Sequence, residues 1–225
     1  MKIQLTLCLV LALMIFSCGS KRMESSNTPI ASDLSKVETS KTDFLQFEPK
    51  HVEGITLEGY EIDIAYEVDS FLIFSAYSDG DLTTSDTPVN WGDRLVQMKD
   101  GSILFQSKPV GDPYEYTPNF YRNSENGKVI IVCQLGNEDH YGGEAFLLEK
   151  GNIHFIGNIE IENPFDLPNN NSLIDILKIT EKDRSIYFEF NSDTLLYLGN
   201  EEWEEVINDG IYYKYSNSRL KLIGL

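Results

Sequence analysis

Three stretches of the chain concentrate bulky apolar residues in runs that are typical of β-strands. They are SFLIFSAYSD (70–79), KVIIVCQLGN (128–137) and SIYFEFNSD (185–193). Each run is rich in β-branched or aromatic residues and ends in residues that favour a turn. A second strand-like run lies before each of them, namely YEIDIAYEVD, YEYTPNFYRN and SLIDILKITEKD. The pattern therefore predicts a pair of adjacent strands in each of three parts of the chain.

Each predicted pair of strands is followed by a segment with the pattern of a β-hairpin. The three segments cover residues 92–108, 143–158 and 210–225, and each begins with glycine. Their turns are KDG (99–101), EKGN (149–152) and SNSR (216–219). Glycine and asparagine in such turns allow the positive φ angles that tight hairpins need. Alternation of apolar and polar residues along YEIDIAYEV and IYFEF indicates strands with one buried and one exposed face.

These strands predict an all-β fold of antiparallel meanders in three similar four-stranded units, at about residues 59–110, 112–160 and 171–225. Each unit has the strand number of a propeller blade. Propellers typically close with about four to eight blades, however, and this chain has strands for only three. A propeller-like arrangement, a β-sandwich and an open barrel of about twelve strands all satisfy the pattern.

A helix is expected in one place, the segment NEEWEEVIN (200–208). Trp203, Val206 and Ile207 are spaced so that they would share one face of a helical turn. The segment is therefore predicted to be a short connector helix with these three residues on its inner face.

The N-terminus has the pattern of an export signal. Lys2 is followed by the apolar run IQLTLCLVLALMIF, which is shorter than the roughly 20 residues needed to cross a bilayer. The run ends at Ile15-Phe16-Ser17-Cys18, which resembles the lipobox of bacterial lipoproteins, and its SCGS edge is similar to that of Bacteroidota lipoproteins. The resemblance implies that residues 1–17 are a signal peptide and that Cys18 is lipidated.

The same resemblance implies a location in the cell envelope. No aspartate follows Cys18, which looks like the form destined for the outer membrane, facing the periplasm or the cell surface. Two or more acyl chains, such as palmitate, anchor a protein stably to a membrane. The alternative is cleavage by an ordinary signal peptidase, in which case Cys18 carries no lipid.

The segment that follows the signal is expected to be a tether. Residues 18–43 are rich in serine and threonine and contain no aromatic residue. Such a segment cannot bury enough apolar area to offset the entropy lost on ordering. The folded part is therefore predicted to be a single all-β domain over residues 44–225.

Composition limits the partners of this domain. Hydrophobic residues make up 41% of the chain and aromatic residues 12%, which is enough to form a core. The formal net charge is −18, so no nucleic acid partner is expected, because binding it depends on lysine and arginine. The acidic residues are spread along the chain and indicate a solvated surface, with a cation-binding surface as the alternative.

The cysteines leave little room for redox or thiol chemistry. Cys8 is lost with the signal peptide and Cys18 would carry lipid, so only Cys133 remains and no internal disulfide can form. Cys133 lies in the apolar run KVIIVCQL, where a small buried hydrophobic residue is expected. A nucleophilic cysteine would need basic neighbours or a helix N-terminus, and neither is present in the sequence around it.

One acidic loop is a candidate calcium site. The stretch YSDGDLTTSD contains Asp79, Asp81 and Asp86, and closely spaced carboxylates are the ligands that Ca²⁺ prefers. An EF-hand loop counted from Asp79 would need glycine and glutamate where this chain has Thr84 and Asn90. A hydrated acidic loop is the alternative, and no other cofactor is expected.

A second candidate is the stretch GNEDHYGG (136–143). It places Glu138, Asp139 and His140 beside two glycines, and carboxylate and imidazole groups together can transfer protons or hold zinc. The other histidines, His51 and His154, have no zinc-motif spacing relative to this stretch. A polar turn between two strands is the alternative.

Several aromatic residues outside these loops could bind a ligand if they are exposed, and would belong to the core if buried. They are Tyr60, Tyr66, Tyr77, Trp91, Tyr114, Tyr116 and Tyr121. The sequence contains no Gly-X-Ser-X-Gly, HExxH or phosphate-binding glycine motif.

These observations favour a lipid-anchored protein of the cell envelope that acts as a non-catalytic binding or structural module, with a protein or saccharide as ligand. One alternative is an envelope hydrolase whose paired carboxylates lie on loops between the units. Another is an immunity or inhibitor type of lipoprotein whose acidic surface binds a basic partner.

Overall fold

A computed structural model describes residues 40–80, 90–111, 115–136, 140–164, 172–199 and 202–225. All of these residues belong to one unit of the chain, Glu38–Leu225. The elements in the described residues are β1 (Thr42–Phe47), β2 (Lys50–His51), β3 (Glu61–Val68), β4 (Phe71–Ser78), β5 (Gly92–Lys99), β6 (Ser102–Gln106), β7 (Glu115–Asn123), β8 (Val129–Gly136), β9 (His140–Glu149), β10 (Asn152–Ile159), β11 (Ile161–Glu162), α1 (Leu173–Ile176), β12 (Leu177–Lys182), β13 (Ser185–Phe190), β14 (Thr194–Gly199), β15 (Glu202–Ile207), β16 (Tyr212–Ser216) and β17 (Arg219–Ile223).

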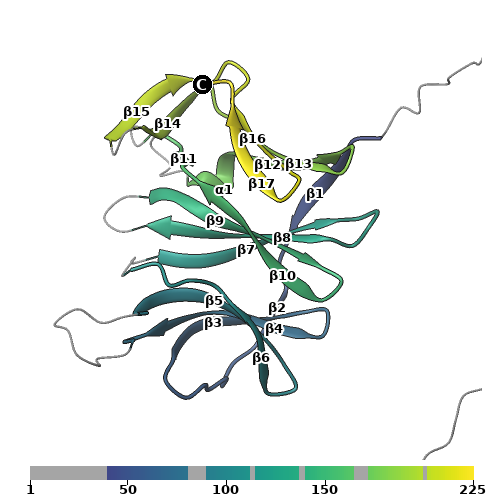
Figure 1. The fold of residues 1–225 in the computed structure, drawn as a ribbon, viewed down its shortest axis with the longest axis vertical. Coiled ribbons are helices and arrows are strands. Elements are labelled where there is room, and N and C mark those ends of the chain that lie inside the picture. The colour runs from purple at the N-terminus through teal and green to yellow at the C-terminus, as the bar shows by residue number, and fades with distance from the viewer. Residues whose placement is uncertain (1–39, 81–89, 112–114, 137–139, 165–171, 200–201) are drawn as a thin grey trace, which may run out of the picture. The chain divides into compact units, whose positions relative to one another are not determined.

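The largest sheet in the described residues has nine antiparallel strands in the order β10-β9-β8-β7-β1-β12-β13-β16-β17 (Figure 1). Its two edge strands approach each other, because a Cβ atom at Gly157 of β10 would lie 2.9 Å from the Leu220 side chain of β17. The sheet is therefore nearly closed and barrel-like. Bending a wide sheet in this way also protects its edges from pairing with other chains.

β1 joins the two halves of this sheet. Phe44–Phe47 pairs with Phe120–Asn123 of β7 on one side, and Thr42–Phe44 pairs with Ile179–Glu181 of β12 on the other. The partners of β1 lie far away in the sequence, so local pattern alone does not reveal this pairing. β1 begins at Thr42, next to the predicted start of the domain at Phe44.

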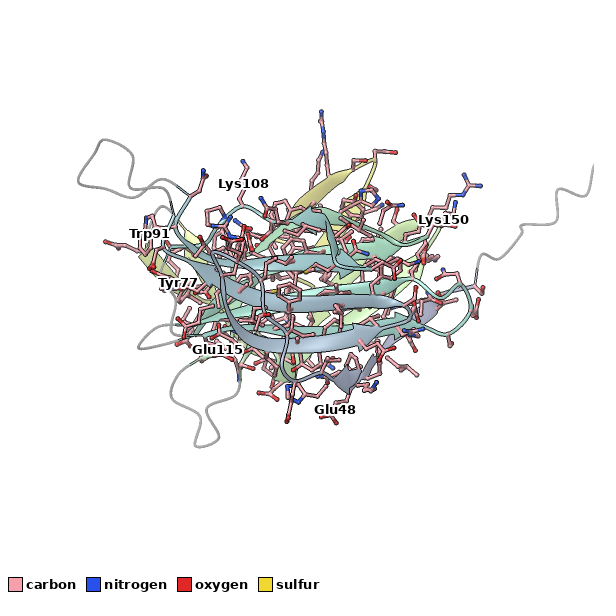
Figure 2. The ribbon with its side chains drawn as sticks, turned by 90° about the horizontal axis from the view of Figure 1, so that it is seen from below. Glu48, Tyr77, Trp91, Lys108, Glu115 and Lys150 are labelled. Carbon is pink, nitrogen blue, oxygen red and sulfur yellow. The ribbon has the colours of Figure 1, made fainter. Side chains whose placement is uncertain are left out.

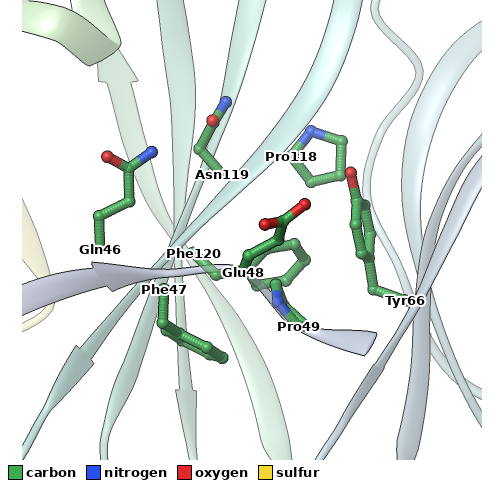
Figure 3. Close-up of a pocket in the computed structure, with 8 residues that line it drawn as sticks. All are labelled: Gln46, Phe47, Glu48, Pro49, Tyr66, Pro118, Asn119 and Phe120. Atoms are coloured by element: carbon green, nitrogen blue, oxygen red, sulfur yellow. The ribbon is translucent and has the colours of Figure 1, made fainter. Parts of the chain in front are cut away.

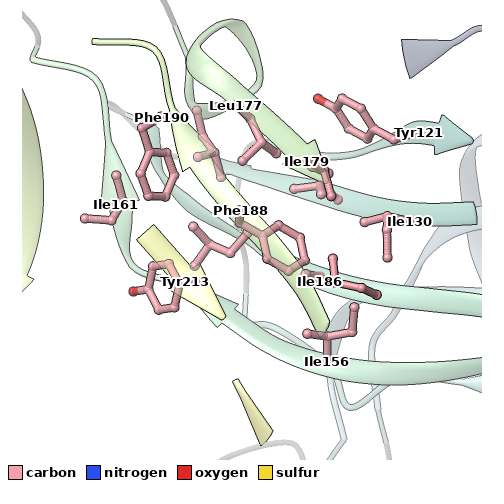
Figure 4. Close-up of a cluster of buried hydrophobic side chains, with 14 of the residues drawn as sticks. Tyr121, Ile130, Ile156, Ile161, Leu177, Ile179, Ile186, Phe188, Phe190 and Tyr213 are labelled. Atoms are coloured by element: carbon pink, nitrogen blue, oxygen red, sulfur yellow. The ribbon is translucent and has the colours of Figure 1, made fainter. Parts of the chain in front are cut away.

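The interior of the nine-stranded sheet is filled by aliphatic and aromatic side chains (Figure 4). Phe188 is fully buried at its centre, and Ile130 and Ile179 are buried from strands on either side of β1. The single described helix, α1, adds Leu173 and Ile176 to the same cluster. A fully buried side chain of this size contributes about 1.5–3 kcal/mol, so this core accounts for much of the stability of the fold.

A five-stranded sheet, β2-β3-β4-β5-β6, packs against the nine-stranded sheet through β4, β5 and β6. Its inner face supplies Val68, Ile73 and Leu95 to a cluster shared with β7, β8 and β9. Its outer face carries Phe74 and Val96, which the segment before β3 covers. The charged residues Glu61, Asp63 and Glu67 of β3 are exposed to solvent. A separate three-stranded sheet has the order β11-β14-β15.

The predicted all-β antiparallel class is confirmed. The hairpins β5–β6, β9–β10 and β16–β17 lie where the sequence predicts them, and their turn residues have positive φ, for example Asp100 (49°) and Asn217 (51°). These values match tight hairpin turns, which need a left-handed backbone at both central residues.

The finer architecture differs from the prediction. In the described residues, the strands of the second and third predicted units share one continuous sheet through β1 rather than forming separate blades, and no propeller is seen there. The third unit is also interrupted, because β13 pairs with β16 and the hairpin β14–β15 lies between them in sequence. The similarity of the three units stays a prediction.

The predicted helix over residues 200–208 is wrong. Glu202–Ile207 forms the edge strand β15, in which Trp203 lies opposite Leu198 and Val206 opposite Leu195. Ile207 is 81% exposed rather than on an inner face. Pairing with the apolar strand β14 supplies the backbone hydrogen bonds that a helix would have made, and this tertiary effect overrides the helix propensity of the glutamates.

Candidate ligand-binding site

A pocket lies where β1 leaves the nine-stranded sheet. The last residue pair between β1 and β7 is Phe47–Phe120. Because the two strands are antiparallel, Pro118, two residues before Phe120 on β7, lies past the end of β1. Proline has no N–H to donate to a neighbouring strand, so Pro118 is tolerated at a position where β7 has no further partner on that side. The chain then turns at Pro49 and enters β2 of the five-stranded sheet. The gap left between β1, β3 and β7 is the pocket (Figure 3).

Three aromatic rings form the apolar part of the pocket. The Tyr66 and Phe120 rings meet edge to face with their centroids 5.1 Å apart, and Phe47 lies 6.1 Å from Phe120. Edge-to-face pairs of this kind stabilise each other beyond the area that they bury. Phe120 is buried, whereas Phe47 and Tyr66 are partly exposed. The pocket therefore has a rigid aromatic base with two rings open to solvent.

Arg122 holds this aromatic group in place from outside the pocket. Its guanidinium carbon lies 4.7 Å from the centroid of the Phe47 ring, a cation–π arrangement. Both Nη atoms also donate 3.0 Å hydrogen bonds to Oδ1 of Asp69, in the turn between β3 and β4. The contact links β7 to the five-stranded sheet, so the two walls of the pocket are tied together beside Phe47.

Polar side chains converge on the same space. Gln46 and Glu48 flank Phe47 in sequence and are exposed, and Asn119 lies between Pro118 and Phe120. Figure 3 shows the Glu48 carboxylate and the Tyr66 hydroxyl near Pro118 on one side of the pocket. Two amides, a carboxylate and a phenol provide both hydrogen-bond donors and acceptors.

The charge in the pocket is small and negative. Glu48 is the only charged residue among its described lining residues. Partial burial, followed by the negative charge of Glu48, raises the pKa of Tyr66 above its ordinary value. Tyr66 therefore stays a neutral phenol at physiological pH and can donate a hydrogen bond. The pocket has a volume of about 460 Å³, within the range of about 300–1,000 Å³ that is usual for small-molecule sites.

The residues of the predicted calcium site are only partly within the described chain. Asp79 is exposed just after β4, whereas Asp81 and Asp86 lie outside the described residues. Within the described residues, no group of three or more His, Cys, Asp or Glu side chains is arranged to hold a metal ion. The calcium site stays a prediction.

The second predicted loop is also only partly described. Glu138 and Asp139 lie outside the described residues, and so does the side chain of His140, the first residue of β9. Gly142 is part of β9 rather than of a turn, and its N–H donates a 3.0 Å hydrogen bond to the buried Glu162. A Cβ atom there would lie 2.1 Å from the carbonyl oxygen of Ile159, so only glycine fits.

Cys133 is fully buried, which confirms the prediction, and its thiol is free rather than part of a disulfide. Burial, followed by the charge of Glu144, raises the pKa of its thiol well above the ordinary value. A thiol in this environment is a poor nucleophile, because the thiolate is the reactive form.

The aromatic residues singled out from the sequence divide between core and surface. Tyr116 and Tyr121 are buried and belong to the core, and Tyr114 lies outside the described residues. Tyr66 lines the pocket described above. The other pocket residues were not identified from the sequence, although a proline inside a strand-like run such as YEYTPNFYRN is a signal that the neighbouring strand ends there.

No family model, curated protein or solved structure matches this chain. The helices in the described residues include none with the length and apolar character needed to span a membrane.

Proposed function

We propose that this protein is a lipid-anchored binding module of the cell envelope, and that its pocket between β1, β3 and β7 binds a neutral saccharide. The observation that carries the proposal is the combination of two open aromatic rings, Phe47 and Tyr66, with the amides of Gln46 and Asn119 and the carboxylate of Glu48. The apolar faces of sugar rings stack on aromatic side chains, and sugar hydroxyls pair with planar amide and carboxylate groups.

The charge of the pocket supports an uncharged ligand. Glu48 is the one charged residue among the described lining residues, and the whole chain has a net charge of −18. An anionic ligand would therefore be repelled both by the pocket and by the surrounding protein. A neutral sugar avoids this repulsion and can use Glu48 as a hydrogen-bond acceptor.

Binding is better supported than hydrolysis. Glycoside hydrolysis generally uses two carboxyl groups on opposite sides of the scissile bond. The described lining residues of the pocket include a single carboxylate, Glu48. Most of the described lining residues also lie on the strands β1, β3 and β7 rather than on long loops, which suits a preformed binding surface.

The anchor is proposed from the resemblance of residues 15–18 to a lipobox. Metabolic labelling with an alkyne fatty acid tests it. Wild-type protein is expected to incorporate the label, and the Cys18→Ser variant is expected to lose it. Equal labelling of both proteins would rule out lipid attachment at Cys18.

The saccharide site is tested by calorimetric titration of the full-length protein in mild detergent with a panel of neutral di- and trisaccharides. At least one saccharide is expected to bind, and Tyr66→Ala is expected to weaken it at least tenfold. A tenfold loss is about 1.4 kcal/mol, which is less than the roughly 1.5–3 kcal/mol that burial of a large apolar side chain contributes. Tyr187→Ala, which removes a partly exposed tyrosine from β13, is the matched control and should leave binding unchanged. No binding by any member of the panel, or equal losses in both variants, would contradict the proposal.

A further inference from the structure

A second pocket lies on the outer face of the five-stranded sheet, at the end where β5 begins and β6 ends. Its volume is about 520 Å³. The side chains that matter for its chemistry are Tyr60, Ser78, Asn90, Arg94, Gln106 and Lys108. The described lining residues include two cations and no carboxylate, which contrasts with the acidic character of the chain as a whole.

Arg94 is placed in this pocket by strand alternation. It lies on the same face of β5 as Val96 and Met98, which belong to the outer apolar cluster, whereas Leu95 faces the inner cluster. Only 4% of Arg94 is exposed. Arginine is rarely buried to this extent unless its charge is paired.

The partners of Arg94 hold the side chain in position but do not neutralise it. Its guanidinium carbon lies 5.5 Å from the centre of the Tyr60 ring, and its Nη2 atom donates to the carbonyl oxygen of Asn90. Its Nε atom is buried without a hydrogen-bond partner, and no carboxylate in the described residues lies within ion-pair distance of it. A buried charge that is left unpaired in this way is costly.

The neighbouring groups are themselves fixed. The Tyr60 hydroxyl donates a 3.0 Å hydrogen bond to Oε1 of Gln106, which sets the orientation of the ring below the guanidinium. Asn90 has a positive φ of 61°, a left-handed conformation that asparagine tolerates well, and this turn directs its carbonyl oxygen at Arg94. Lys108 is exposed and projects outward, so its ammonium group is available at the mouth of the pocket (Figure 2).

We propose that this pocket binds the carboxylate of a small polar molecule, such as a sugar acid or an N-acylated amino acid. A carboxylate matches the planar fork of a guanidinium, and it would neutralise the charge that the described residues leave unpaired. Lys108 would attract the ligand, and Ser78 and Gln106 are placed to bind its other polar groups. A dianion such as phosphate is disfavoured because the chain as a whole has a net charge of −18, which repels a second negative charge more strongly than a single one.

The test is calorimetric titration of the full-length protein with two acids and their neutral counterparts. The pairs are galacturonate with galactose, both measured on the Tyr66→Ala variant so that the proposed saccharide site does not contribute, and N-acetylalanine with N-acetylalanine amide. Inorganic phosphate is a fifth probe. At least one acid is expected to bind at least tenfold more tightly than its neutral counterpart and than phosphate. The pair that shows the difference identifies the source of the carboxylate. Equal binding of acid and neutral compound, tighter binding of phosphate, or no binding of either acid would overturn the proposal.

Four variants locate the site. Arg94→Gln is expected to lower the affinity for the acid at least tenfold. Because Arg94 is buried, Lys108→Ala at an exposed position provides a test that leaves the fold intact, with an expected loss of about threefold that diminishes as salt is added. Arg122→Gln, near the first pocket, should not change the affinity, and a loss there equal to that of Lys108→Ala would also overturn the proposal. The Tyr66→Ala variant should keep acid binding, so the outcomes for the two pockets are independent.

Discussion

The Tyr116 hydroxyl donates a 2.7 Å hydrogen bond to the Glu144 carboxylate in the space between the five-stranded and nine-stranded sheets. Both residues are more than nine-tenths buried. Tyr116 belongs to the apolar cluster that the two sheets share, and Glu144 lies opposite Cys133 across the pair β8–β9. A carboxyl group in this position is removed from water and keeps one strong partner.

This environment predicts a pH-dependent stability. Burial raises the pKa of Glu144 above its ordinary value of 4.5, and the hydrogen bond from Tyr116 offsets only part of that change. The folded state therefore binds a proton more tightly than the unfolded state. The contribution of Glu144 to stability is complete below pH 4.5 and is lost as pH rises through its folded-state pKa. In urea unfolding between pH 4 and 8, Glu144→Gln is expected to lose less stability with rising pH than the wild type, and parallel profiles would contradict this.

The hydrogen bond from the Tyr116 hydroxyl to Glu144 is expected to stabilise the folded protein. Tyr116→Phe keeps the ring and removes the donor, so the carboxylate of Glu144 is left buried without it. The free energy of unfolding at pH 7 is expected to fall by about 1–3 kcal/mol. Tyr187→Phe, on a partly exposed tyrosine, should change it far less, and equal effects of the two substitutions would show that the hydrogen bond is unimportant.

Gly142 is predicted to be intolerant of any side chain. Its φ is +81° and an added Cβ would lie 2.1 Å from the backbone oxygen of Ile159. Gly101 has a similar φ of +77° but nothing within 4 Å of an added Cβ. Gly142→Ala is therefore expected to destabilise the protein by about 3 kcal/mol or more, and Gly101→Ala by about 1 kcal/mol, the cost of the backbone conformation alone. Thermal unfolding of both variants measures the difference, and similar losses would show that β9 can shift away from Ile159.

Glu181 is predicted to stabilise the junction of β7 and β12 with β1. Its carboxylate accepts hydrogen bonds from Lys128 (2.6 Å), Asn126 (2.8 Å) and Asn123 (3.3 Å), and it is largely buried. Glu181→Ala removes the acceptor that these three donors share, although Lys128 keeps its ion pair with Glu149 and Asn123 its hydrogen bond to Thr42. A loss of about 1–3 kcal/mol is therefore expected in urea unfolding.

The control for Glu181 is the exposed ion pair between Glu67 and Lys50. These groups are 2.7 Å apart, but their side chains are 43% and 75% exposed. Exposed pairs contribute little, so Glu67→Ala should change the free energy of unfolding by about 0.5 kcal/mol or less. A Glu181→Ala effect of the same small size would mean that the junction does not depend on this network.

The turn of the last hairpin offers a stabilising substitution. Ser218 has a φ of 57°, in the left-handed region that favours glycine, and it follows Asn217 in a two-residue turn. Ser218→Gly creates the Asn-Gly pair that such turns prefer, so an increase of about 0.5–1 kcal/mol is expected. Ser102→Gly, at the first residue of β6, should instead lower stability, since glycine weakens a strand. A decrease for Ser218→Gly in thermal unfolding would contradict the prediction.

The three hairpins could be predicted from the sequence because the residues that determine a hairpin are close together in the chain. Turn chemistry at Asp100-Gly101 and at Asn217-Ser218 lies between apolar strands and sets their pairing. The place of β1 between β7 and β12 could not be predicted, because its partners are distant in sequence and β-pairing depends on tertiary context. The same reason explains why β15 was predicted to be a helix. The spacing of Trp203, Val206 and Ile207 fits a helix, and the pairing with β14 that makes this segment a strand is a tertiary contact that the spacing does not reveal.

The first pocket was beyond prediction for a related reason. Tyr66 was one of several aromatic residues, and the sequence alone does not separate those that are buried, such as Tyr116, from those that line a pocket. Phe47 and Phe120 meet only because β1 pairs with β7 at its last residue. A binding site at the border of two sheets is therefore defined by long-range pairing.

Tyr66 is proposed to contribute an open aromatic ring to a saccharide site, and NMR of this ring shows whether a bound saccharide lies against it. The full-length protein with ¹³C-labelled tyrosine is titrated with the saccharide that binds most tightly, and Tyr66→Phe and Tyr187→Phe assign the two signals. If the saccharide stacks on Tyr66, the Tyr66 ring signals shift in a saturable manner while those of Tyr187 stay unchanged. Saturable binding that leaves the Tyr66 signals in place would contradict the proposed contact.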